Sequence, residues 1–157
     1  MSVFFRTGYM DDALFELPMI LDRAEAELTD PEFPEFDTIV GTGFSGGVVI
    51  PALALRLGKK FLLIRKDSDD SHHSGKMIGE IDRRWIFVDD FTETGTTRSR
   101  VIDKVSEIED LDAFVRGPDG LYPLTAPKLQ TVLVGSYYYQ QYDVERRIDT
   151  TTVWLGG

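Results

Sequence analysis

The chain has 157 residues, 42% of them hydrophobic and 11% aromatic, so it can enclose one core and we expect a single domain. Its 17 Lys and Arg against 27 Asp and Glu give a formal net charge of −10, which argues against nucleic acid or an anionic membrane surface as a partner. The chain has no cysteine, which excludes disulfides and thiolate sites. It has neither a signal-like N-terminus nor an apolar run of membrane-spanning length, so we expect a cytoplasmic protein.

The first part of the chain predicts a helix, a strand and a second helix. Apolar residues keep a helical period over residues 10–28, where Pro18 predicts a bend or a helix that begins at the proline. Residues 38–40 predict a short buried strand that runs into a glycine-rich turn. A helix is then expected from near Gly47 to Gly58.

Three further buried strands are predicted, over residues 61–64, 85–88 and 131–134. A polar stretch at residues 67–79 separates the first two and is expected to be mobile. An amphipathic helix is expected to begin near residues 95–97. Continuous apolar strands that alternate with helices indicate an α/β fold with a mainly parallel sheet and helices on both of its faces.

Residues suited to ligand binding follow three successive strands. The first strand leads into the glycine-rich turn at residues 41–46, the second into Arg65 and Lys66, and the third into Asp89 and Asp90. In an open α/β sheet, ligands bind outside the carboxyl ends of the strands. All three groups would therefore lie along one edge of the sheet, where a polyphosphate sugar with a divalent cation would need them.

The most informative string is Phe-Val-Asp-Asp-Phe-Thr-Glu-Thr-Gly-Thr-Thr, at residues 87–97. Two carboxylates at a strand end suit sugar hydroxyls and hydrated magnesium, which prefers oxygen ligands. The threonine-rich turn that follows offers backbone amides and hydroxyls at a helix start, where the helix dipole favours a phosphate. An ordinary acidic strand end with a threonine N-cap explains any one of these residues, but it explains the whole string less well.

This string resembles the diphosphoribose-binding signature of type I phosphoribosyltransferases. The resemblance extends over about residues 36–139, because residues 41–46 look like the pyrophosphate loop of that family and residues 63–66 look like the strand end before its flexible catalytic loop. It implies a Rossmann-like core with a small hood built from the chain ends, for which residues 1–28 and 134–157 are the candidates.

The resemblance also implies an activity, a cofactor and an assembly. The protein would transfer 5-phosphoribosyl from 5-phosphoribosyl-1-diphosphate (PRPP) to a nitrogenous base, with Mg²⁺ as cofactor, release of pyrophosphate and a homodimeric assembly. Asp89 and Asp90 would contact the ribose hydroxyls directly or through the metal. The full set implied to bind PRPP is Asp89, Asp90, Thr92, Thr94, Gly95, Thr96, Thr97, Thr42, Gly43, Ser45 and Arg65.

The residues implied at the reacting centre come from two segments. Catalysis of this kind consists largely of electrostatic stabilisation of the leaving group and exclusion of water, which closure of residues 67–79 would provide. The basic residue that the family carries shortly before the loop histidine is missing here, and Lys76 is the candidate replacement. A solvated polar loop with two incidental histidines is the alternative. The implied catalytic residues are Glu93, Lys66, His72, His73 and Lys76.

Two features give conflicting predictions of the base. The sequence His-His-Ser-Gly-Lys at residues 72–76 resembles the loop of orotate-type enzymes. By contrast, Glu93 stands where 6-oxopurine enzymes carry an acid that meets the purine N7 proton. A carboxylate beside the reacting nitrogen has a direct role in accepting a proton, so we expect a purine. Tyr137, Tyr138 and Tyr139 are candidates for stacking on the base, although aromatic residues at a strand end also serve as core or dimer contacts.

Two other functions stay open. The turn at residues 41–46 also satisfies Gly-x-Gly-x-x-Gly, as in nicotinamide oxidoreductases, but the next strand ends in Arg65 and Lys66 rather than an acid, so only the NADP form would fit. A Walker-type nucleotidase is disfavoured because this turn has no Lys followed by Ser or Thr. A regulatory protein of the same fold that binds PRPP or nucleotides without catalysis is the second alternative.

Overall fold

The computed structural model describes residues 1, 3, 16–66, 77–92, 94–108, 114–123 and 129–156. Within these ranges one mixed sheet has the strand order β3-β2-β1-β4-β7-β8, and β9 also pairs with β7. The pairs β1–β2, β1–β4 and β4–β7 are parallel, while β3, β8 and β9 join antiparallel. The strands are β1 (Thr38–Thr42), β2 (Lys60–Ile64), β3 (Met77–Gly79), β4 (Arg84–Asp89), β7 (Thr131–Tyr138), β8 (Ile148–Asp149) and β9 (Val153–Leu155).

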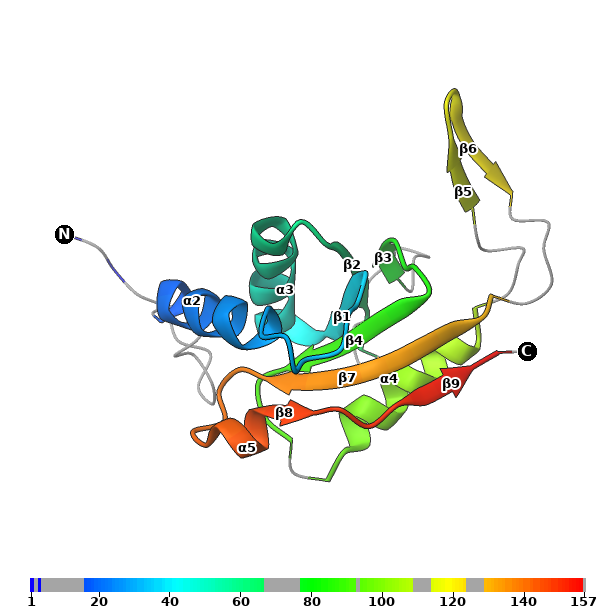
Figure 1. The fold of residues 1–157 in the computed structure, drawn as a ribbon. Helices are drawn as coiled ribbons and strands as arrows, with labels where there is room; N and C mark the ends of the chain where they lie inside the picture. The colour runs from blue at the N-terminus through cyan, green and yellow to red at the C-terminus, as the bar shows by residue number, and fades with distance from the viewer. Residues whose placement is uncertain are drawn as a thin grey trace.

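Helices cover both faces of the sheet, as predicted. Figure 1 shows α2 (Leu17–Leu28) and α3 (Gly43–Leu57) on one face and α4 (Thr96–Ser106) on the other. Because successive strand residues point to opposite faces, Ile39 packs with the first pair of helices and Val40 packs with α4. The central strands are buried on both faces and read as continuous apolar runs, which confirms the predicted α/β class.

The second helix begins earlier than predicted. The helix α3 starts at Gly43 rather than near Gly47, so the second half of the glycine-rich turn is the first turn of a helix and Pro51 lies inside it. Glycine has a low helix propensity, but the helix that these residues begin buries Val49 against the sheet. The helix ends at Gly58 as predicted, because this residue adopts the left-handed φ of 66° that favours glycine.

The first helix and the segment after β2 give one agreement and one correction. The helix α2 carries Pro18 in its first turn, where the proline has no intrahelical amide bond to lose, which agrees with the predicted helix that begins at the proline. Residues 10–15, where the alternative bend would lie, are outside the described residues. The prediction of mobility over residues 67–79 is wrong for its last three residues, because Met77–Gly79 form β3 and pair with β2. The remainder, residues 67–76, lies outside the described residues.

The C-terminal part of the chain extends the sheet. The strand β7 runs over Thr131–Tyr138, twice the length predicted, and a short helix, α5 (Val144–Arg147), leads from it to β8. The strands β8 and β9 then pair antiparallel with β7, which was not predicted. A hood formed by the chain ends stays a prediction.

A separate hairpin of β5 (Phe114–Gly117) and β6 (Gly120–Pro123) projects from the body of the molecule (Figure 1). Its two-residue turn is closed by Gly120 at a φ of 143°. The hairpin exposes large apolar side chains, among them Phe114 and Leu121. No helix in the described part of the chain is long and apolar enough to cross a membrane.

Candidate functional site

The carboxyl ends of β1 and β2 are joined directly. The parallel register pairs Thr42 with Ile64, and the Thr42 hydroxyl donates a hydrogen bond of 2.6 Å to the Ile64 carbonyl. This bond is buried, so it fixes the start of the glycine-rich turn beside the strand that delivers Arg65 and Lys66. The two groups predicted to meet at the sheet edge therefore do meet.

The turn brings the Lys66 ammonium against the backbone at the start of α3. Gly43 has a left-handed φ of 86°, and a Cβ added there would lie 3.1 Å from Lys66 Cε and 3.3 Å from its Nζ. Glycine at this position thus permits both the turn and the close approach of the cation. Ser45 follows in α3, but its side chain lies outside what the structure describes.

The acidic pair ends β4 on the same edge of the sheet. The Asp89 carboxylate accepts the Asp90 amide at 2.9 Å, and the Asp90 carboxylate accepts the Phe91 amide at 2.7 Å. Burial disfavours the charged form of Asp89 and the Asp90 carboxylate repels it, so the pKa of Asp89 rises to about 7, although the Lys66 ammonium counteracts part of this effect. Near neutral pH the pair therefore either binds a proton readily or is stabilised by a nearby cation.

The threonine-rich turn leaves the start of α4 open. Gly95 precedes the helix with a left-handed φ of 74°, and a Cβ added there would meet nothing within 4 Å. The hydroxyls of Thr94 and Thr96 are 2.7 Å apart, and no acidic residue occupies the first turn of the helix. Backbone amides at such a terminus lack intrahelical partners and favour an anion. Glu93 lies outside the described residues.

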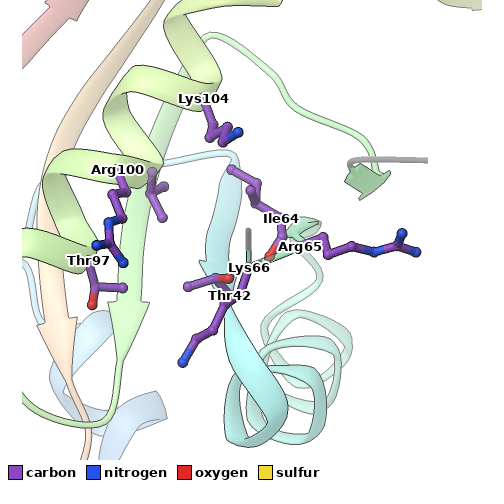
Figure 2. A pocket seen from close by; sticks show the side chains of 8 residues that line it. Thr42, Ile64, Arg65, Lys66, Thr97, Arg100 and Lys104 are labelled. Carbon is purple, nitrogen blue, oxygen red and sulfur yellow. Dashed lines mark hydrogen bonds between the residues drawn. The ribbon is translucent and has the colours of Figure 1, made fainter. Parts of the chain in front are cut away.

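A cavity of about 430 Å³ lies between the ends of β1 and β2 and one side of α4 (Figure 2). Four of its lining residues are cationic and none is acidic among the described residues, although the chain as a whole has a formal net charge of −10. Sequence analysis did not identify Arg100 and Lys104 as part of the site. The lining residues are Thr42, Ile64, Arg65, Lys66, Thr97, Arg100, Val101 and Lys104.

The tyrosines predicted to stack on a base lie in the core. Tyr137 and Tyr139 are 0% exposed and Tyr138 is 4% exposed. This burial favours the packing role, and the base-binding role stays a prediction. Thr92 is exposed beside the acidic pair, and its backbone carbonyl accepts a hydrogen bond of 3.5 Å from the side-chain amide of Gln141. The remaining predicted site residues, His72, His73 and Lys76, lie outside the described residues.

Sequence comparison identifies a related enzyme. The chain is 32% identical, over 108 residues, to adenine phosphoribosyltransferase of Bifidobacterium longum subsp. infantis, and the alignment covers 59% of this chain and 55% of that protein. The chain thus spans about half the length of this relative. No protein-family model matches the sequence.

Solved structures give a weaker similarity. Adenine phosphoribosyltransferase of Thermoanaerobacter pseudethanolicus has a TM-score of 0.42 at 18% identity, over 59% of this chain and 62% of that one. Orotate phosphoribosyltransferase of Aeropyrum pernix has a TM-score of 0.47 at 22% identity, over 66% of this chain and 58% of that one. The sequence similarity to the Bifidobacterium enzyme agrees with the resemblance of residues 87–97 to the signature of the type I phosphoribosyltransferases.

Proposed function

We propose that this protein is an enzyme that transfers the 5-phosphoribosyl group of PRPP to a nitrogenous base and releases pyrophosphate. The observation that carries the proposal is the meeting of a cation-lined cavity, a half-buried acidic pair and an open helix start at one edge of the sheet. The sequence similarity to the bacterial adenine phosphoribosyltransferase supports this proposal.

The proposed binding mode divides PRPP among the three groups. The 5-phosphate lies against the amides and hydroxyls at the start of α4, where Thr94 and Thr96 stand. The ribose hydroxyls face Asp89 and Asp90, and the diphosphate faces Lys66. Each negative part of the substrate thus meets amides or cations, and the neutral hydroxyls meet the carboxylates.

The acidic pair fits a magnesium site of the kind that polyphosphate enzymes use. Burial and the neighbouring Asp90 carboxylate raise the pKa of Asp89 to about 7, and a divalent cation relieves the repulsion that contributes to this rise. No group of three or more acidic or imidazole side chains that could hold a metal occurs within the described residues. Asp89 and Asp90 would therefore hold Mg²⁺ together with substrate and water oxygens, as is usual for this ion, and the metal would neutralise charge on the diphosphate.

The reaction requires one bond to break and one to form. The bond from C1 of the ribose to the diphosphate oxygen breaks, and its electron pair leaves with pyrophosphate. A ring nitrogen of the base donates its lone pair to C1, and the base then loses a ring N–H proton. Lys66 and Arg65 are proposed to stabilise the negative charge that develops on the leaving group. Glu93 is proposed to accept the proton, with a purine as the base.

Several finer roles stay predictions. His72, His73 and Lys76 would close over the reacting centre and exclude water, and a homodimer in the cytoplasm is expected from the resemblance. Light scattering on the purified protein tests the dimer. Alanine substitution of these three residues tests the lid, because full activity in the triple variant would remove them from the chemistry.

A panel assay tests the proposed function. The protein is incubated with PRPP, Mg²⁺ and single bases (adenine, hypoxanthine, guanine, uracil or orotate), and pyrophosphate release is followed. We expect release with a purine, and none from the variant that combines Asp89→Asn with Asp90→Asn. The exposed Asp103→Asn change on α4 is the control. Binding of PRPP without release under every condition would favour a regulatory protein, and binding of NADPH alone would favour an oxidoreductase.

A further inference from the structure

One side of α4 carries a row of residues that faces the cavity. Thr97, Arg100, Val101 and Lys104 follow the spacing of three and four residues that places side chains on one side of a helix. Val101 is 2% exposed and packs in the core with Val40 and Phe87, so it fixes the rotation of the helix about its axis. Arg100 and Lys104 consequently lie at the edge of the cavity on the α4 side, as Figure 2 shows.

The opposite wall consists of the residues expected to meet a diphosphate. Thr42 lies in the glycine-rich turn, and Lys66 packs against Gly43 at the start of α3. The cavity therefore has cations on two walls that come from different elements. Its volume of about 430 Å³ lies within the range of small-molecule sites, roughly 300–1,000 Å³.

The cavity gathers four cationic side chains, two that follow β2 and two on α4. A multiply charged anion between the two walls attracts cations from both sides of the cavity. The row from Thr97 to Lys104 covers eight residues, about 10 Å along the axis, which is long enough for more than one phosphate group.

We propose that Arg100 and Lys104 bind the diphosphate of PRPP from the α4 side of the cavity, opposite Lys66. This inference rests on the proposed function and adds two residues to it that the family resemblance does not include. When the C1 to oxygen bond breaks, its electron pair moves onto the diphosphate oxygen, and these two cations share the resulting charge. They bind the leaving group and do not touch the 5-phosphate, which lies at the start of the helix.

Titration calorimetry with inorganic pyrophosphate and Mg²⁺ tests the proposal without requiring turnover. The variant that combines Arg100→Gln with Lys104→Gln keeps two good helix formers and removes two charges. The matched control combines Arg83→Gln with Arg116→Gln, because both are exposed and lie before β4 and in the hairpin. We expect the Arg100/Lys104 variant to lose at least about tenfold in pyrophosphate affinity per charge removed. The control should stay within twofold of wild type.

A second titration separates the diphosphate from the 5-phosphate. Ribose 5-phosphate should bind the wild type and the Arg100/Lys104 variant with affinities within about threefold of each other. Equal pyrophosphate affinity in wild type and this variant, no pyrophosphate binding by wild type, or a loss confined to ribose 5-phosphate would each overturn the inference. Thermal unfolding verifies that the variant is folded, and each single substitution repeats the test if it is not.

These outcomes are distinct from failure of the proposed function. A wild-type protein that transfers phosphoribosyl groups while the Arg100/Lys104 variant keeps its pyrophosphate affinity refutes only the inference. A wild-type protein that binds pyrophosphate through these two residues, but transfers nothing to any base, refutes only the proposed function.

Discussion

Changing Asp89 to Asn should stabilise the folded protein more at alkaline than at acidic pH. The pKa of Asp89 rises on folding from 3.8 to about 7, mainly because burial disfavours its charge. A carboxyl of this kind is protonated in the folded protein, but ionised in the unfolded chain, over the range between the two values. Folding stability therefore falls as the pH rises from about 4 to about 7.

The size of the effect follows from the same values. The difference between 3.8 and about 7 corresponds to about 4 kcal/mol at most. Asp89 is half-buried and water reaches the pair, so we expect roughly half of this. Because pH 5 already lies above the unfolded value of 3.8, about two thirds of this falls between pH 5 and pH 8. The stabilisation that Asp89→Asn gives over wild type should thus be larger at pH 8 than at pH 5, by about 1 kcal/mol.

Urea unfolding at pH 5 and pH 8 measures this quantity, and the fluorescence of the fully buried Trp85 reports unfolding. Comparing the variant with wild type removes the contribution of other groups that titrate in this range. The exposed Asp103→Asn change on α4 removes one negative charge elsewhere and serves as the control. A stabilisation by Asp89→Asn that is equal at both pH values, or greater at pH 5, would refute the electrostatic account of the acidic pair.

Three other changes test separate parts of the structure. Gly43→Ala should destabilise the fold by about 1–2 kcal/mol and weaken pyrophosphate binding, because the left-handed φ of 86° disfavours alanine and the added Cβ crowds Lys66; normal values in urea unfolding and calorimetry would count against this role. Arg147→Met should lower the free energy of unfolding in urea by about 3–5 kcal/mol, because it removes the guanidinium that lies 2.9 Å from the largely buried Glu27 carboxylate. A loss below about 1 kcal/mol would contradict this. Glu93→Gln should lower the rate of transfer about 100-fold and change PRPP affinity less than twofold, and unaltered turnover would remove Glu93 as the base-side acid.

The central strands could be predicted because buried parallel strands have a direct sequence signal. Residues 38–40, 61–64 and 85–88 are continuous apolar runs, and each lies within a strand of the structure. The start of α3 could not be predicted in the same way. The glycines at positions 43, 46 and 47 indicate a turn, and no local signal shows that the helix packed on the sheet at Val49 extends back to Gly43.

The hairpin of β5 and β6 was missed although its turn has a recognisable sequence. Gly-Pro-Asp-Gly at residues 117–120 is typical of a tight turn, but four-residue strands with exposed apolar side chains show no burial pattern. The antiparallel strands β8 and β9 were missed for a similar reason, since they have two and three residues.

The candidate site was predicted at its strand ends and missed along its helix. Asp89 and Lys66 follow apolar runs, so their place at the sheet edge could be inferred from topology alone. Whether Arg100 and Lys104 face the cavity depends on how α4 is rotated about its axis, which burial of Val101 determines. The spacing of three and four residues from Thr97 was the available signal, and it identifies a helix side without showing what that side faces.

Phosphorus NMR of the protein with PRPP, Mg²⁺ and a purine tests the central claim most directly, because it follows both products in one sample. The proposed transfer predicts that PRPP disappears while pyrophosphate and a purine ribonucleotide appear in equal amounts, and that both require the base. Pyrophosphate that accumulates without nucleotide, or PRPP that persists with every base offered, would contradict the claim that this protein is a phosphoribosyltransferase.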